Sequence, residues 1–577
     1  MIKYHCKDCG IDTEKSECAI CLKRADVESK LYWCSHCNIP TYDKVCPICM
    51  NEGEYFAKDA RPVFPEERLL IEALLGKPLA FINSSVWKTT GNGNQYCVDG
   101  KKIKFLMSTL LDVEAKEIKK ILDTHEERNN STYFKQNIKL FIAANKSRYN
   151  YICSEAIDYI KDIAKNYDSS DMFVSFSGGK DSTVVSDLVV RALNKPEIIH
   201  IFGDTTLEFP ETAEYLERFK SVNRRTPVLT SKNSEQDFFE MCKLVGPPSR
   251  LLRWCCAVFK TGTISRKIQI TFKNKTRILT FYGIRRSESN SRKSYERNSE
   301  SPKISKQKVS SPIIDWFDYE IWLYILTTGI DFNTAYKLGY SRVGCWCCPN
   351  NSKWAQFLSS VYMPVQYNRF KDLLIDFAKN MGKNDPEVYV KQGGWKARQG
   401  GAGIELSKKV VIPFTPCASE EDTFDYELNK PIDDELHELF KPFGWLSKDM
   451  GNPRLGEVYV LGKDGTPILK IQGRAGTKRL RVSILKLPIA GTKRLIEAEL
   501  KVKCQITKFQ LCLGCRACEG ICKHNAISLK RIDNAGETYT YSIDDEKCTR
   551  CGQCINHFNG GCYMRRVLLP RGELYGL

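Results

Sequence analysis

A six-residue loop offers the clearest anion-binding chemistry in the chain. The loop is Ser177-Gly178-Gly179-Lys180-Asp181-Ser182, and it stands between an apolar run over 172–176 and a helical pattern over 183–193. The two glycines let the backbone turn sharply, and the free N–H groups and dipole of the following helix face the loop. The lysine adds a positive charge and the serines add hydroxyl donors. The loop therefore predicts a phosphate, pyrophosphate or sulfate site, with a simple capped turn as the alternative. It is not a Walker A loop.

Cysteine is the second abundant source of chemistry. The chain has 26 cysteines, most of them in short C-x2-C pairs. The start, Met1 to Cys6, lacks an apolar signal segment, and no apolar run reaches the roughly 18–20 residues of a membrane helix. We therefore expect a cytoplasmic protein without a membrane partner, in which the cysteines bind metal instead of forming disulfides.

The first fifty residues contain an internal repeat of C-x2-C-x8-C-x2-C. Four thiolates in two such pairs suit tetrahedral zinc and can fold a segment too short for a core of its own. We predict two zinc ions in tandem zinc ribbons, with iron in a rubredoxin-like site as the alternative. Such modules bind nucleic acid or serve as structural and protein-contact units. The ligands would be Cys6, Cys9, Cys18 and Cys21 in the first unit and Cys34, Cys37, Cys46 and Cys49 in the second.

A further cysteine group lies in the middle of the chain. Cys255 and Cys256 are adjacent, and Cys345-Trp346-Cys347-Cys348 follows much later. Adjacent cysteines rarely both bond one small ion without strain, whereas an iron–sulfur cluster offers separate iron corners to thiolates. The group favours a cluster over zinc, and buried structural cysteines are the alternative.

The elements that position these residues suggest a multidomain α/β chain. Apolar runs over 172–176, 198–202 and 278–282 alternate with helical patterns, which predicts a parallel sheet covered by helices. The segment 69–75 predicts a short helix, 91–94 a hairpin turn, and 457–461 and 480–485 strands. The expected domains are zinc ribbons (1–54), a mixed connector (55–164), a nucleotide-binding domain (165–365), a β-rich domain (366–500) and a cysteine-dense module (501–577).

Four motifs in order resemble the phosphoadenylyl-sulfate (PAPS) reductase family of the PP-loop adenine nucleotide α-hydrolase superfamily. Besides the loop 177–182, they are the segments 204–212 (DTTLEFPET), 283–289 (GIRRSES) and 312–316 (PIIDW). The resemblance implies a PP-loop domain that binds an adenine nucleotide, either ATP or a sulfonucleotide (APS or PAPS), with Mg²⁺ as a candidate companion. It implies nucleotide-binding roles for Ser177, Gly178, Gly179, Lys180, Asp181, Ser182, Asp204, Gly283 and Arg285, and catalytic roles for Lys180, Asp204, Lys260, Arg285 and Arg286. Arg285 and Arg286 would neutralise phosphate or sulfate oxygens.

The basic stretch 285–311 that begins with these arginines is also rich in serine. One interpretation is a solvated loop, and another is a lid that orders on an anionic substrate. We expect a mixture, in which the first arginines are functional and the rest of the stretch is mobile.

Two cysteine patterns carry further resemblances. The middle group resembles the cluster motif of iron–sulfur-type adenylylsulfate reductases, which implies a [4Fe-4S] cluster on Cys255, Cys256, Cys345 and Cys348 with Lys260 nearby. The C-terminal run resembles a two-cluster ferredoxin, although Lys523 replaces the usual proline. In that arrangement the fourth cysteine of each run serves the other cluster. The implied sets are Cys512, Cys515, Cys518 and Cys562 for one cluster and Cys548, Cys551, Cys554 and Cys522 for the second.

These features support three hypotheses. The first is an iron–sulfur-dependent, PAPS reductase-like enzyme that reduces or transfers sulfur with electrons from its own ferredoxin module. Such reductases carry a thiol tail of the type E-C-G-x-H, and this sequence lacks it. The second is an ATP-dependent sulfurtransferase that thiolates DNA or RNA, with a cysteine desulfurase or an electron donor as partner. The net charge of +18 favours polyanion binding. The third is a non-catalytic, nucleic-acid-binding redox sensor.

Overall fold

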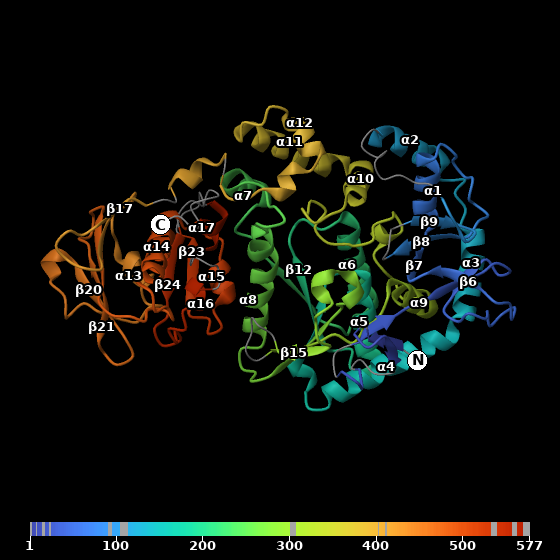
Figure 1. Ribbon diagram of the computed structural model, residues 1–577, viewed down its shortest axis with the longest axis horizontal. Helices are drawn as coiled ribbons and strands as arrows, with labels where there is room; N and C mark the ends of the chain where they lie inside the picture. The colour runs from blue at the N-terminus through green and yellow to red at the C-terminus, as the bar shows by residue number, and fades with distance from the viewer. Residues whose placement is uncertain are drawn as a thin grey trace.

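The computed structural model describes residues 3–6, 8–13, 18–21, 25–90, 95–103, 113–300, 307–401, 403–409, 412–531, 539–556 and 562–568. Small antiparallel sheets at the N-terminus lead to a central parallel sheet, an antiparallel sheet and a cysteine-rich C-terminal module (Figure 1). The predicted multidomain α/β class is confirmed. None of the helices in the described residues combines the length and apolar character that a membrane crossing requires.

The N-terminal sequence repeat appears as two sheets with the same strand arrangement. Their orders are β2-β1-β3 and β5-β4-β6, and all pairs are antiparallel. In each sheet the central strand ends at the first cysteine of the unit, Cys6 or Cys34. The strands are β1 (Lys3–Cys6), β2 (Ile11–Thr13), β3 (Asp26–Glu28), β4 (Leu31–Cys34), β5 (Ile39–Thr41) and β6 (Glu54–Ala57).

A connector follows, in which the described residues form one sheet and four helices. Its sheet has the order β10-β9-β8-β7, and the helix predicted over 69–75 is confirmed as part of α1. The predicted turn over 91–94 lies outside the described residues. The elements are β7 (Asp59–Pro62), α1 (Pro65–Leu74), β8 (Val86–Thr90), β9 (Gln95–Val98), β10 (Lys101–Lys102), α2 (Ala115–His125), α3 (Thr132–Ala144) and α4 (Lys146–Ala164).

The central sheet has the order β13-β12-β11-β14-β16-β15, and only its edge strand β15 is antiparallel. The three predicted strands are confirmed as β11 (Met172–Phe176), β12 (Ile199–Asp204) and β14 (Ile278–Tyr282). Successive residues of β11 face opposite sides of the sheet: Val174 packs with α4, α5 and α9, and Phe173 packs with α8. Because helices cover both faces, these strands are largely apolar on both sides.

The remaining elements of this domain are the other strands of the sheet and the helices that pack around it. They are α5 (Lys180–Leu193), α6 (Pro210–Val222), β13 (Val228–Lys232), α7 (Phe238–Val245), the π-helix η3 (Cys256–Thr261), α8 (Gly262–Thr271), β15 (Asn298–Glu300), β16 (Gln307–Ser310) and α9 (Asp318–Thr328). Three helices follow, namely α10 (Lys353–Tyr362), α11 (Pro364–Asn380) and α12 (Pro386–Lys391).

A six-stranded antiparallel sheet precedes the cysteine-rich module. Its order is β17-β18-β22-β21-β20-β19, and the two predicted strands are confirmed as β20 and β22. The strands are β17 (Phe414–Pro416), β18 (Thr423–Glu427), β19 (Trp445–Ser447), β20 (Glu457–Leu461), β21 (Pro467–Gln472) and β22 (Arg479–Ile484), with α13 (Asp434–Glu438) between β18 and β19.

The module itself lies between this sheet and α8 of the central domain (Figure 1). Helix α15 packs against α8 and the π-helix η3, so the module contacts the nucleotide-loop domain directly. Its elements are α14 (Leu495–Leu511), α15 (Ala517–Ile521), β23 (Ile527–Arg531), β24 (Tyr539–Ile543), α16 (Gln553–Asn556) and α17 (Tyr563–Leu568).

Candidate active site

The predicted anion loop connects β11 to α5, as the sequence suggested. Gly178 has a positive φ of 70°, a conformation that favours glycine, and Gly179 is the N-cap of α5. Ser182 Oγ lies 3.1 Å from Ser177 Oγ and donates to the carbonyl of Gly179 at 2.9 Å. These bonds hold the loop in a tight turn at the positive end of the helix dipole, where an anion is favoured.

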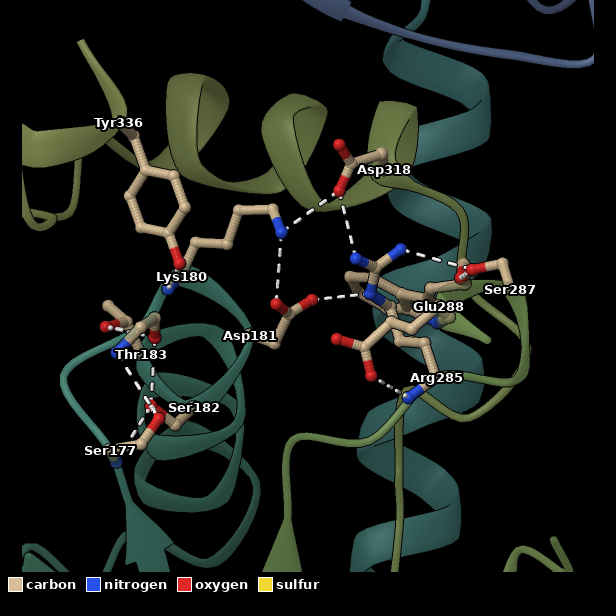
Figure 2. Close-up of polar contacts among 12 residues, drawn as sticks. Ser177, Lys180, Asp181, Ser182, Thr183, Arg285, Ser287, Glu288, Asp318 and Tyr336 are labelled. Atoms are coloured by element: carbon tan, nitrogen blue, oxygen red, sulfur yellow. Dashed lines mark hydrogen bonds and ion pairs between the residues drawn. The ribbon is translucent and has the colours of Figure 1, made fainter. Parts of the chain in front are cut away.

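Four buried charged groups form a network directly behind the loop (Figure 2). Lys180 Nζ lies 3.1 Å from both Asp181 Oδ2 and Asp318 Oδ1. The Arg285 guanidinium bonds to Asp181 through Nε and to Asp318 through a terminal nitrogen at 2.9 Å. Two cations and two carboxylates thus neutralise one another, and Lys180 and Arg285 are only 3% and 4% exposed.

The pKa values follow from this pairing. Burial alone would raise the pKa of Asp181, but Arg285 and Lys180 outweigh it and bring the pKa to about 2. The pKa of Asp318 is lowered by the same two cations against the same burial. Both carboxylates are therefore ionised at neutral pH, and Arg285 holds the loop through its ion pair with Asp181. Arg286, the other arginine expected at phosphate, pairs with Asp315 and donates to the carbonyl of Tyr295 at 2.9 Å.

The sequence analysis missed Asp318 and two further residues, Asp59 and Tyr336, that complete the network. Asp59, from the connector strand β7, accepts hydrogen bonds from the backbone N–H of Asp318 at 3.1 Å and of Tyr319 at 2.9 Å. It therefore fixes the start of α9. Tyr336 Oη accepts from the backbone N–H of Lys180 at 3.1 Å. Burial and the neighbouring Asp318 raise the pKa of Asp59 to about 7. No motif marks either residue, because their role depends on the fold.

Gly283 fits the loop for a steric reason. A Cβ atom there would lie 2.7 Å from the backbone nitrogen of Ser182 and from the carbonyl carbon of Asp181. The carboxyl end of β14 can approach the start of α5 this closely only with glycine. The sequence analysis placed Gly283 at the nucleotide, and the structure places it against the loop backbone.

Asp204 lies at the end of β12. Its Oδ1 accepts from the backbone N–H of Thr206 at 2.8 Å, and its Oδ2 is 3.6 Å from Lys232 Nζ. The same segment reaches the middle cysteine group, since Thr205 Oγ1 lies 3.4 Å from Cys345 Sγ and the backbones of Glu208 and Cys345 form a β-bridge. The segment 204–212 thus joins the nucleotide loop to the cysteines.

The middle cysteines gather around this contact. The thiol of Cys255 interacts electrostatically with Cys256 and Cys345, and that of Cys345 with Cys348 and Lys260. Burial, opposed by Lys260, raises the pKa of Cys345 to about 12. The structure therefore brings together the four proposed ligands and the predicted lysine.

The C-terminal cysteines fall into the two expected groups. The thiol of Cys515 interacts with Cys512, Cys518 and Cys562. The second set, Cys522, Cys548, Cys551 and Cys554, lines a single small cavity. Each set includes the fourth cysteine of the other run, which is the crossed arrangement of a two-cluster ferredoxin. These soft thiol donors in a largely apolar shell fit [4Fe-4S] clusters.

The N-terminal cysteines are packed more tightly. The sulfur atoms of Cys6, Cys9, Cys18 and Cys21 lie within 4.8 Å of one another, and so do those of Cys34, Cys37, Cys46 and Cys49. Across the described residues, groups this compact occur at these two places alone. The backbone N–H of Cys21 lowers the pKa of the Cys18 thiol to about 6, and the backbone N–H of Asn51 lowers that of the Cys49 thiol to about 7. Such compact sets fit one tetrahedral ion each, whereas the wider spacing of the other sets leaves room for a multi-atom cluster.

The basic stretch 285–311 is expected to combine functional first arginines with a mobile remainder, and several side chains of that remainder make defined contacts. Arg292 pairs with Glu288, and Arg297 pairs with Glu155 and lies 3.7 Å from the centre of the Tyr159 ring. The segment 298–300 forms β15. These side chains are neutralised within the fold, while 301–306 lie outside the described residues.

Comparison with known families agrees with this geometry. Residues 171–351 match the phosphoadenosine phosphosulfate reductase domain, and residues 511–557 match a 4Fe-4S dicluster domain. The chain carries a PAPS reductase domain. The loop 177–182 and the C-terminal cysteine run therefore fall within two separately matched regions of one chain.

Individual relatives share parts of the chain. The adenosine 5'-phosphosulfate reductase of Shouchella clausii is 26% identical over 214 residues, which cover 34% of this chain and 83% of that protein. An uncharacterized protein of Methanocaldococcus jannaschii is 29% identical over 327 residues, which cover 56% of this chain and 62% of that protein. The chain thus spans a little under two thirds of that relative. The crystal structure of PAPS reductase from Candida auris, a phosphate complex, aligns with 33% of this chain and 95% of its own at 16% identity and a TM-score of 0.26.

Proposed function

We propose that this chain is an iron–sulfur-dependent, PAPS reductase-like enzyme of the cytoplasm. It binds an adenine nucleotide, ATP or a sulfonucleotide, at the loop 177–182 and reduces or transfers sulfur with electrons from its own C-terminal module. The observation that carries this proposal is the packing of that module on the π-helix η3, which holds Cys256 and Lys260.

The contact between the module and the nucleotide domain is specific. A Cβ on Gly520 of α15 would lie 2.9 Å from the Cα of Gly262, so the two backbones approach closely. Arg516 pairs with Glu235 at 2.5 Å, and Gln269 donates to the carbonyl of Cys522 at 3.0 Å. Such close glycine packing flanked by polar bonds supports a fixed docking of the module, not a tethered one.

The docking also orders the cysteine sets. Cys515 and Cys562 pack in the same hydrophobic cluster as Cys255 and Cys345. Their set mates Cys512 and Cys518 pack in the cluster of the antiparallel sheet, where the packed members of the Cys522 set also lie, so the Cys512 set alone reaches both clusters. The Cys512 set is therefore proximal to the nucleotide domain, and the Cys522 set is distal. This order supports a path from the distal set through the proximal set to the middle cysteines.

The residues of the chain then have defined tasks. The loop N–H groups bind the nucleotide phosphates, Asp318 and Asp181 hold Lys180 and Arg285 in place behind them, and Lys260 lies beside Cys345. Three [4Fe-4S] clusters on the cysteine sets supply single electrons when bound, and cleavage of a sulfonucleotide at its sulfur–oxygen bond takes two electrons to yield sulfite and the nucleotide phosphate. Two zinc ions complete the N-terminal units.

The test is anaerobic turnover of the iron-reconstituted protein with a viologen donor. ATP, adenylyl sulfate and phosphoadenylyl sulfate are supplied in parallel, and sulfite and pyrophosphate are measured. Sulfite from a sulfonucleotide is the expected result. The matched variant is Gly520→Val, which we expect to keep its iron but to lose most sulfite formation because α15 no longer fits against Gly262. Full turnover of this variant would contradict the docking argument.

A second candidate function rests on the two compact N-terminal four-cysteine groups and the net charge of +18. Both suit an ATP-dependent sulfurtransferase that thiolates DNA or RNA, with a cysteine desulfurase as sulfur donor. In the same assay this function gives pyrophosphate from ATP, stimulated by nucleic acid, and no sulfite. Nucleotide binding without either product leaves a nucleic-acid-binding redox sensor.

A further inference from the structure

Lys508 is a buried cation in the cysteine-rich module. It lies in the last turn of α14, its residue is only 5% exposed, and its Nζ donates to the backbone carbonyl of Cys554 at 3.1 Å. Among the described residues it forms no ion pair with a carboxylate. A buried charge without an opposite charge is strongly disfavoured, so Lys508 requires anionic neighbours of another kind.

Those neighbours are the cysteines of both C-terminal sets. Lys508 interacts electrostatically with Cys554 of the distal set and with Cys518 and Cys562 of the proximal set. Cys504, one helical turn earlier on the same face of α14, is a further neighbour. The carboxyl end of α14 also favours a cation. Helix α14 thus places the Lys508 ammonium group near cysteines of both sets.

The chemistry of the sets gives this position a consequence. A cluster held by four thiolates is an anion, and one-electron reduction makes it more negative by one charge. A fixed cation nearby stabilises the reduced form more than the oxidised form, and the effect is large where water is excluded. Net charge and burial are among the features by which a protein sets the potential of such a cluster.

We propose that Lys508 is a positioning residue for electron transfer, which raises the reduction potential of both clusters of the module at once. Because it acts on both sets, it shifts the two potentials in the same direction, so that the free energy of electron passage between the clusters changes little. The inference rests on the dicluster module and is independent of the chemistry at the nucleotide loop.

The test is a redox titration of the full-length, iron-loaded protein without nucleotide, followed by EPR of the reduced clusters. Lys508→Met is expected to lower the ratio of reduced to oxidised cluster at a fixed ambient potential by about tenfold for both clusters, a shift of about 59 mV each. The control is Lys503→Met on the same helix, which removes an equal charge but one that pairs with Glu499. This control is expected to leave both ratios within about twofold.

A second pair of variants separates charge from folding. Lys508→Gln keeps a hydrogen-bond donor for the Cys554 carbonyl but no charge, and Lys508→Arg keeps the charge. Iron and sulfide contents are measured first, and if Lys508→Met loses clusters, the comparison is made with Lys508→Gln. Lowered potentials in the neutral variants and retained potentials in Lys508→Arg support the proposal. Unchanged potentials in a neutral variant with full iron content, or an equal shift in Lys503→Met, would overturn it. Because no nucleotide is present, failure here leaves the proposed function untouched.

Discussion

The nucleotide loop and the cysteine sets both bury polar groups, but they do so in opposite ways. Behind the loop, Lys180 and Arg285 are matched by Asp181 and Asp318, so the charges cancel within the chain. The cysteine sets gather thiols whose thiolate forms repel one another, so a bound metal has to balance most of their negative charge. Single cations act on these thiols, among them Lys508, Lys260 and, beside Cys548, Arg550.

This difference implies that the region around the nucleotide loop can fold without a ligand, whereas the cysteine sets need bound metal to fold. A self-neutralised network is complete before any ligand arrives and can hold the loop ready for an anion. A thiolate set gains its folding free energy from the bound ion. We therefore expect the central domain to respond to substitutions of single charges, and the cysteine regions to respond to loss of metal.

The largest effect that follows is loss of metal from an N-terminal unit. Cys34→Ser removes one of the four ligands of the second four-cysteine group. Structural zinc supplies on the order of 10 kcal/mol to such a unit, so we expect the variant to lose one zinc ion and residues 31–57 to lose hydrogen-exchange protection. The control is Cys97→Ser, a buried cysteine in the same hydrophobic core but outside the group. Retention of zinc by Cys34→Ser would show that this set does not depend on metal in the expected way.

The ionic network should respond strongly to removal of one carboxylate. Asp318→Ala leaves the buried Lys180 and Arg285 with a single shared counter-charge, Asp181. Breaking a buried ion pair costs about 3–5 kcal/mol, and we expect a clear fall in the melting temperature of the central domain. Asp331→Ala is the matched control, because its partner Arg218 is exposed and such pairs contribute about 0–1 kcal/mol. Equal effects of the two substitutions would contradict a structural role for the network.

Asp59 gives the network a pH dependence of its own. Its pKa is about 7 in the fold, against an ordinary value of 3.8. The folded state therefore binds this proton more tightly, and its contribution to stability is complete below about pH 4 and lost as the pH rises through 7. The slope is about 1.4 kcal/mol per pH unit and the total at most about 4 kcal/mol. Asp59→Asn has no proton to lose at this position. Between pH 5 and 7 the free energy of unfolding of the native protein should therefore fall relative to that of the variant. Parallel pH profiles of the two proteins would refute the assignment.

The sequence predicted the parts of this molecule that repeat a local pattern. The strand 172–176, the loop 177–182 and the repeated cysteine units all follow from neighbouring residues. Asp59 and Asp318 escaped prediction, because a lone aspartate near a strand or at the start of a helix is usually a surface or capping residue. Their place in the network depends on how α9 and β7 pack, because Asp318 pairs with Lys180 and Asp59 holds the start of α9. The contacts of the basic stretch after Arg285 could not be predicted for the same reason, since partners such as Glu155 lie far away in sequence.

The smallest effect tests how closely the strand β14 must approach the loop. Gly283→Ala places a Cβ 2.7 Å from the backbone of Asp181 and Ser182, so either the strand or the start of α5 must shift. Overpacking of this kind costs about 1–3 kcal/mol. We expect a modest loss of stability and a larger loss of nucleotide affinity, because the loop N–H groups move with α5. Gly344→Ala is the control, since a Cβ there meets no atom within 4 Å. Thermal melts and equilibrium binding of nucleotide to both variants make the measurement. If Gly283→Ala bound nucleotide as well as the control, the fixed geometry of the loop would not depend on this contact, and the ionic network alone would have to account for it.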